Sequence, residues 1–64
     1  MKAVLIQFKN KWEDIWDNVA IAENKTVANK YIDKLKKEYP DCYGEIHGQF
    51  YLSYFNIITE AEME

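Results

Sequence analysis

The chain has 64 residues, of which 48% are apolar and 16% aromatic, and its formal net charge is -3. These fractions exceed those of disordered chains, so we expect one packed domain spanning residues 1–64. A domain this small buries only about 60% of its unfolded surface, and many such domains rely on disulfides, a metal or self-association. The single cysteine, Cys42, and single histidine, His47, exclude an internal disulfide and a multi-Cys/His zinc site, which leaves self-association.

Targeting signals are absent from the sequence. The apolar run at residues 3–6 is far too short for a signal-peptide core, and no stretch approaches a membrane span. A lone thiol suits a reducing compartment. We therefore expect a cytoplasmic protein.

Two extended segments open the chain. Residues 2–9 carry β-branched and aromatic side chains on both faces, which predicts a strand at the centre of a sheet. Residues 18–22 alternate small residues with Val19 and Ile21, and we expect these two side chains to point into the core. A polar, tryptophan-bearing loop connects the two strands.

A helix is predicted from Asn24, a good N-cap residue, to residue 39. Pro40 ends it, because the residue before a proline is pushed out of helical geometry. Apolar and aromatic residues recur along it at helical spacing and should cover the sheet. They are Ala28, Tyr31, Ile32, Leu35 and Tyr39.

Residues 41–44 are predicted to form a turn and residues 45–58 an extended segment. In that segment Ile46, Phe50, Leu52 and Tyr54 share one face, whereas Phe55 and Ile57 fall on the other. A bulge at residues 54–56 would reconcile the two faces.

An alternative is a hairpin at residues 47–48, with residues 43–46 pairing back on residues 49–52 and Gly48 supplying a positive φ. Residues 59–64 form an acidic tail that we expect to be frayed. The predicted fold class is therefore α+β in ββαβ order, with a small antiparallel sheet of three strands, or four with the extra hairpin, and one helix on one face.

The element order, the helix sequence at residues 31–40 and the aromatic closing strand resemble small ββαβ proteins of phages and mobile elements. This resemblance implies a cytoplasmic protein made during infection. Proteins of this size and origin are often inhibitors that bind a host enzyme or defence component, such as anti-CRISPR proteins. The resemblance transfers no functional residue to this chain.

Residues able to perform chemistry are few, so we expect a non-enzymatic protein without a cofactor or metal. Cys42 and His47 could approach each other, but no third group that would position them is visible. The neighbouring acids Glu13 and Asp14 lack the phosphate-loop or His-Glu motif that would indicate a site.

Charge gives two weaker hypotheses. Lysines make the predicted helix locally basic, but the lack of arginine removes the usual bidentate reader of guanine and phosphate, so we do not expect direct nucleic-acid binding. The acids could instead mimic DNA, although lysines dilute them. The lysines are Lys25, Lys30, Lys34, Lys36 and Lys37, and the acids are Glu13, Asp14, Asp17, Asp41, Glu45, Glu60, Glu62 and Glu64.

The loop between the first two strands is the leading candidate for binding a partner, because tryptophans are favoured anchors at interface centres. Its residues are Trp12, Glu13, Asp14, Ile15, Trp16 and Asp17. In the alternative interpretation, Trp12, Ile15 and Trp16 lie at helical spacing and cap the end of the core.

A second candidate surface is an aromatic set on the last strand, through which we expect a homodimer to form. The competing interpretation is that this face receives another protein or stacks a nucleotide base. It comprises Phe50, Tyr51, Tyr54 and Phe55. We expect a phage-encoded inhibitor that occupies a surface of a host protein. The alternatives are a protein that sequesters a nucleotide signal between subunits and a structural or accessory phage protein.

Overall fold

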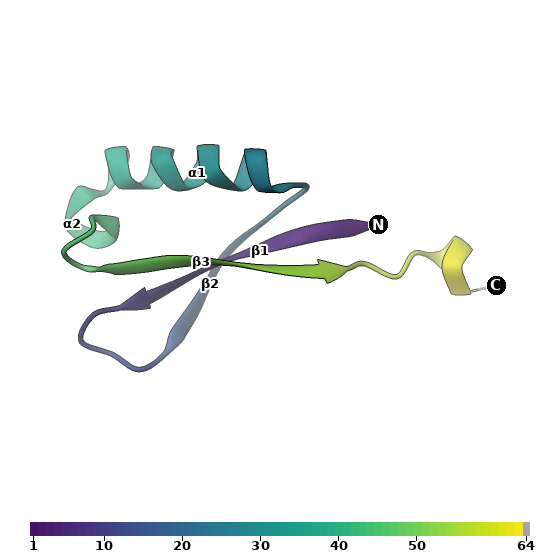
Figure 1. Ribbon diagram of the computed structural model, residues 1–64, viewed down its shortest axis with the longest axis horizontal. Coiled ribbons are helices and arrows are strands. Elements are labelled where there is room, and N and C mark those ends of the chain that lie inside the picture. The colour runs from purple at the N-terminus through teal and green to yellow at the C-terminus, as the bar shows by residue number, and fades with distance from the viewer. Residues whose placement is uncertain (64) are drawn as a thin grey trace.

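The strand β1 (Lys2–Asn10) is the centre of a three-stranded antiparallel sheet in the computed structural model, which describes residues 1–63. β2 (Trp16–Ala22) and β3 (Gly48–Asn56) flank it as the two edge strands. The helix α1 (Lys25–Glu38) connects β2 to β3 and lies over one face of the sheet (Figure 1). The predicted α+β fold in ββαβ order, with residues 2–9 central, is confirmed.

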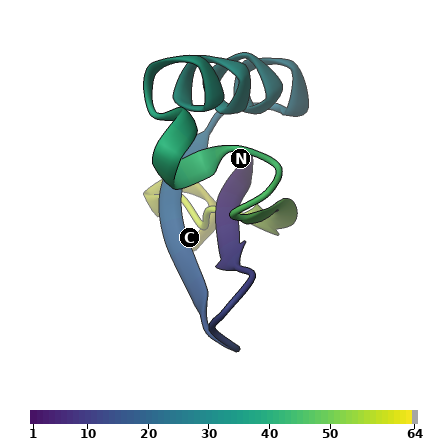
Figure 2. The same ribbon diagram turned by 90° about the vertical axis from the view of Figure 1, so that its left-hand side faces the viewer.

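The core lies between α1 and one face of the sheet. Val4, Ile6 and Phe8 point from β1 towards the helix and are at most 4% exposed. Half-buried side chains surround them, among them Val19, Ala20, Phe50 and Leu52. No element within residues 1–63 covers the opposite face, which we call the open face; Figure 2 shows α1 and the short helix below it on the same side of the strands.

α1 begins as predicted, because the Asn24 side chain accepts a hydrogen bond of 2.9 Å from the backbone N–H of Val27. Three of the predicted core positions on the helix are buried: Ala28, Ile32 and Leu35. The other two predictions are wrong. Tyr31 is 37% exposed, and Tyr39, at the end of the helix, is 53% exposed. The apolar stripe that contacts the sheet is therefore narrower than the predicted one.

The predicted direction of Ile21 is wrong. Ile21 pairs with Leu5 on the open face and is 63% exposed. The cause is a shift of register between Ile6 and Gln7, which leaves Val19 as an extra residue on β2. The bulge turns Ala20 and Ala22, rather than Ile21, towards the helix.

The pairing of β3 with β1 is regular from Lys2–Asn56 to Asn10–Gly48, so the bulge predicted at residues 54–56 is wrong. Simple alternation places Phe55 on the open face. Ile46 precedes the strand and is 73% exposed, so it does not belong to a strand face.

The alternative hairpin is also wrong. Residues 40–43 form a second short helix, α2 (Pro40–Tyr43), instead of the predicted turn, and residues 45–47 form a turn before β3. Within the described residues no glycine has a positive φ. The rings of Phe8, Tyr43 and Phe50 pack against one another, with the ring centroids of Phe8 and Phe50 4.9 Å apart and those of Phe8 and Tyr43 5.1 Å apart.

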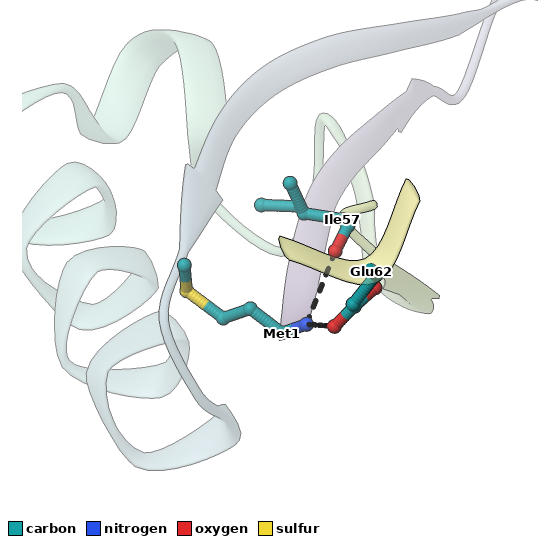
Figure 3. A network of polar contacts seen from close by, with 3 residues as sticks. All are labelled: Met1, Ile57 and Glu62. Carbon is teal, nitrogen blue, oxygen red and sulfur yellow. Dashed lines mark hydrogen bonds and ion pairs between the residues drawn. The ribbon is translucent and has the colours of Figure 1, made fainter. Parts of the chain in front are cut away.

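The acidic tail forms a 3₁₀ turn at Glu60–Met63, and Glu64 lies outside the described residues. The amino group of Met1 donates a hydrogen bond to the Ile57 carbonyl oxygen and lies 3.2 Å from a carboxylate oxygen of Glu62 (Figure 3). These contacts bring the tail beside the start of β1. None of the described helices is long and apolar enough to cross a membrane.

Candidate functional site

The tip of the hairpin between β1 and β2 presents apolar side chains to solvent. Trp12 is 69% exposed and Ile15 is 62% exposed, which contradicts the interpretation that the loop caps the core. The tip is shaped by Asn10, whose side chain accepts a hydrogen bond of 3.0 Å from the backbone N–H of Trp12. Glu13 and Asp17 are exposed as well. The predicted partner-binding loop is therefore accessible throughout.

At the base of the hairpin, Trp16 packs across the open face against Tyr51. Their ring centroids are 4.3 Å apart and their planes meet at 79°, an edge-to-face contact. Lys9 opposes Trp16 in the sheet, and its ammonium lies 5.6 Å from the centre of the indole ring. The Tyr51 hydroxyl donates a hydrogen bond of 2.8 Å to Gln49. These residues link all three strands.

Lys9 also forms an ion pair with Asp14, with 2.9 Å between the ammonium nitrogen and the carboxylate oxygen. The hydrogen bond from Lys9, followed by its positive charge, holds the pKa of the Asp14 carboxyl below its ordinary value. We name Lys9, Asp14, Trp16, Gln49 and Tyr51 the hairpin cluster. Lys9 therefore connects the exposed hairpin tip to the aromatic pair.

Lys9 and Gln49 belong to this site, although the sequence did not predict them as site residues. The strand register brings them to it: Lys9 pairs with Trp16 on β2 and with Gln49 on β3. A lysine within a predicted central strand was the available signal, because a charged side chain there needs an exit to solvent or a partner.

Farther along the open face, the surface is polar in the middle and apolar at its far end. Gln7 donates a hydrogen bond of 3.2 Å to Asn18 and accepts one of 2.9 Å from Ser53. Beyond this polar row lie Ile21 and Phe55, which are 63% and 36% exposed. The face therefore has two separated apolar areas, and the one at the hairpin includes the ion pair of Lys9 with Asp14.

The second predicted surface does not lie on one face. Tyr51 and Phe55 are on the open face, whereas Phe50 and Tyr54 alternate to the helix side of β3. Phe50 is half-buried beside the core, and Tyr54 is 64% exposed near the start of α1. The four aromatic residues thus belong to two different surfaces that share the β3 edge.

Cys42 and His47 belong to different segments, α2 and the turn before β3. Cys42 is exposed on α2, and the His47 ring lies beside Trp12, with 5.9 Å between ring centroids. No hydrogen bond joins Cys42 to His47 in residues 1–63. That part of the chain also contains no group of three or more metal-ligating side chains, at Glu13 and Asp14 or elsewhere.

The charged residues do not form a single surface. The lysines of α1 lie on the exposed sides of the helix, apart from the half-buried Lys36, whose ammonium is 6.0 Å from the centre of the Phe50 ring. Among the acids that could mimic DNA, Asp14 is paired with Lys9 and Glu62 with the amino group of Met1. Glu64 lies outside the described residues.

Comparisons of this chain with protein families, with curated proteins and with solved structures found no match.

Proposed function

We propose that this protein is a non-enzymatic, phage-encoded inhibitor that occupies a surface of a host protein, such as a defence component. The hairpin cluster, continued by the exposed Trp12 and Ile15 at the tip, supports the binding role. The phage origin and the anti-defence role, of the anti-CRISPR kind, rest on the resemblance described above.

The observation that carries the binding role is the ordered contact of Trp16 with Tyr51, at 4.3 Å between ring centroids, beside a tryptophan that is 69% exposed. A packed aromatic pair loses little conformational entropy on binding, because its rotamers are already restricted. Trp and Tyr are also enriched among residues that dominate binding energy. The acids Glu13 and Asp17 beside them favour a partner with basic groups around an apolar pocket.

The test is capture of a partner from host lysate by the tagged protein, followed by mass spectrometry and by binding of the purified partner. We expect Trp12→Ala with Trp16→Ala to abolish the interaction while the circular dichroism spectrum stays native. Ile58→Ala is the matched control, because Ile58 is 67% exposed and remote from the hairpin. Equal capture by both variants would refute the proposed surface.

A second candidate, sequestration of a nucleotide, is favoured by a hollow of about 430 Å³ beside the hairpin cluster, lined by Lys9, Lys11 and Tyr51 among others. Lysines there could meet phosphate while Tyr51 stacks on a base. Against it, Lys9 is already paired with Asp14. Nucleotide released from the purified, denatured protein would favour this function over inhibition of a protein.

A further inference from the structure

The free edge of β3 has the features of a strand that pairs with another strand. Over its nine residues β3 contains no charged residue and no proline, which are the usual devices that block edge pairing. The other edge strand, β2, carries Asp17 and the bulge at Val19. β3 is therefore the edge that is open to pairing.

The hydrogen bonds to β1 show which groups of β3 point outwards. Met1 and Ile57 exchange two backbone hydrogen bonds, and the N–H of Lys11 donates to the His47 carbonyl at the other end of the same register. Because hydrogen-bonded and non-hydrogen-bonded pairs alternate in an antiparallel ladder, the odd-numbered residues of β3 bond to β1. The outward N–H and C=O groups belong to the even-numbered residues: Gly48, Phe50, Leu52, Tyr54 and Asn56.

We propose that two copies of this chain pair through β3, antiparallel and centred on Leu52, to form a continuous six-stranded sheet. A two-fold axis perpendicular to the sheet keeps both α1 helices on the same side. Centring it on Leu52 pairs the whole of Gly48–Asn56, because Leu52 is its midpoint. Every outward group of β3 then finds a partner, and no charged residues oppose each other.

In this register, a side chain of each copy would fill a groove of the other. Between α1 and the β3 edge is an open groove of about 630 Å³, lined by Ile32, Lys36, Phe50 and Leu52 among others. The pairing places Tyr54 of the partner subunit opposite Phe50, at this groove. Tyr54 is 64% exposed in a single copy, so the dimer would bury it beside the Phe50 ring and the Lys36 ammonium.

The proposed contact runs along one whole edge of the sheet. A nine-residue strand pair together with two reciprocal tyrosine contacts engages backbone and side chains along one whole edge. This inference does not depend on the proposed protein-binding function, because the Trp12 and Trp16 side chains lie outside the paired edge.

The test combines mass measurement with amide exchange. Size-exclusion chromatography with light scattering should give twice the monomer mass, falling to the monomer mass on dilution. By NMR, the amides of Phe50, Leu52 and Tyr54 should exchange slowly in the dimer and lose that protection on dilution. The amides of Tyr51 and Ser53, bonded to β1, should stay protected at both concentrations. A monomer at all concentrations, or unprotected even-numbered amides in a dimer, would overturn the proposal.

Two variants distinguish pairing through the β3 edge from packing through the open face. Tyr54→Pro removes one outward N–H and the groove-filling ring, and it should give a folded monomer. Ile21→Lys changes the open face and should remain a dimer. A dimeric Tyr54→Pro together with a monomeric Ile21→Lys would show that the copies pack through the open face, and it would overturn the edge pairing. If Tyr54→Pro does not fold, the amide-exchange pattern of the unmodified chain still shows whether β3 is paired.

Trp12→Ala with Trp16→Ala should leave the mass of the dimer unchanged. A failure of partner capture is therefore distinguishable from a failure of strand pairing.

Discussion

Trp16 and Tyr51 stand edge to face with 4.3 Å between their ring centroids, although they belong to the two edge strands and β1 runs between them. Lys9 of β1 pairs with Trp16, and its ammonium lies 5.6 Å from the centre of the indole ring. A contact between the two edge strands opposes the separation of either β2 or β3 from β1. It also holds the aromatic surface of the hairpin cluster in one geometry.

This contact predicts an energetic coupling between Trp16 and Tyr51. In a double-mutant cycle with Trp16→Ala and Tyr51→Ala, we expect a coupling of about 0.5 to 1.5 kcal/mol in the free energy of unfolding, because edge-to-face pairs contribute that much beyond surface burial. Denaturant titration of the four proteins measures it. A second cycle, joining Tyr51→Ala with Ile58→Ala, should give a coupling near zero. Additive losses in the first cycle would contradict the contact.

The pair of Lys9 and Asp14 predicts a specific pH dependence. The pKa of Asp14 is lowered, so the contribution of the pair to stability is present above the ordinary pKa of an aspartate and is lost as the pH falls through the lowered value. In Lys9→Gln, the midpoint of the Asp14 carboxyl titration, followed by ¹³C NMR, should rise. An unchanged midpoint would show that Lys9 does not act on this carboxyl. The difference in stability between the two proteins should shrink in acid but not vanish, because Lys9 also packs on Trp16.

Leu35 is the buried residue near the C-terminal end of α1, at 7% exposure. We expect Leu35→Ala to lower the free energy of unfolding by about 2 to 5 kcal/mol, since it removes buried apolar surface and leaves a cavity. This is a large part of the stability of a domain this small. Lys34→Ala, on the exposed side of the same helix turn, should change it by no more than about 0.5 kcal/mol. Equal denaturation midpoints for the two variants would place Leu35 outside the core.

The parts of the fold that were predictable depend on local signals. β1 was recognisable as the central strand because apolar side chains occupy both of its faces, and α1 because Asn24 caps it and Pro40 limits it. Each of these features acts within a few residues of the chain. Neither requires knowledge of which segments meet in space.

The direction of Ile21 and the composition of the hairpin cluster depend instead on register. One extra residue at Val19 reverses the faces of β2, and period-two alternation alone cannot reveal it. Lys9, Trp16 and Tyr51 are brought together only by the pairings of β1 with both neighbours. The sequence therefore identified the exposed tryptophan loop as a candidate site but assigned Tyr51 to a different surface.

Gly48 is the clearest case of a residue whose identity is explained by a tertiary contact. Only the alternative hairpin would have given Gly48 a positive φ, and in the structure Gly48 is the first residue of β3 and has no positive φ. A Cβ atom at this position would collide with the Lys9 carbonyl oxygen and would lie 2.6 Å from the Cζ atom of Phe8. Glycine is therefore required because the backbone of β3 approaches β1 closely.

Gly48→Ala should consequently lower the free energy of unfolding by about 1 to 3 kcal/mol, the usual cost of overpacking at a site that cannot relax. The neighbouring backbone must shift, and Lys9 shifts with it, so we also expect the indole N–H resonance of Trp16 to move. Asn56→Ala, at the other end of the same strand, is the matched control and should change stability by no more than about 0.5 kcal/mol. Native stability in Gly48→Ala would mean that the two strands do not approach this closely. A stability loss without a change at Trp16 would mean that the hairpin cluster is held independently of the start of β3.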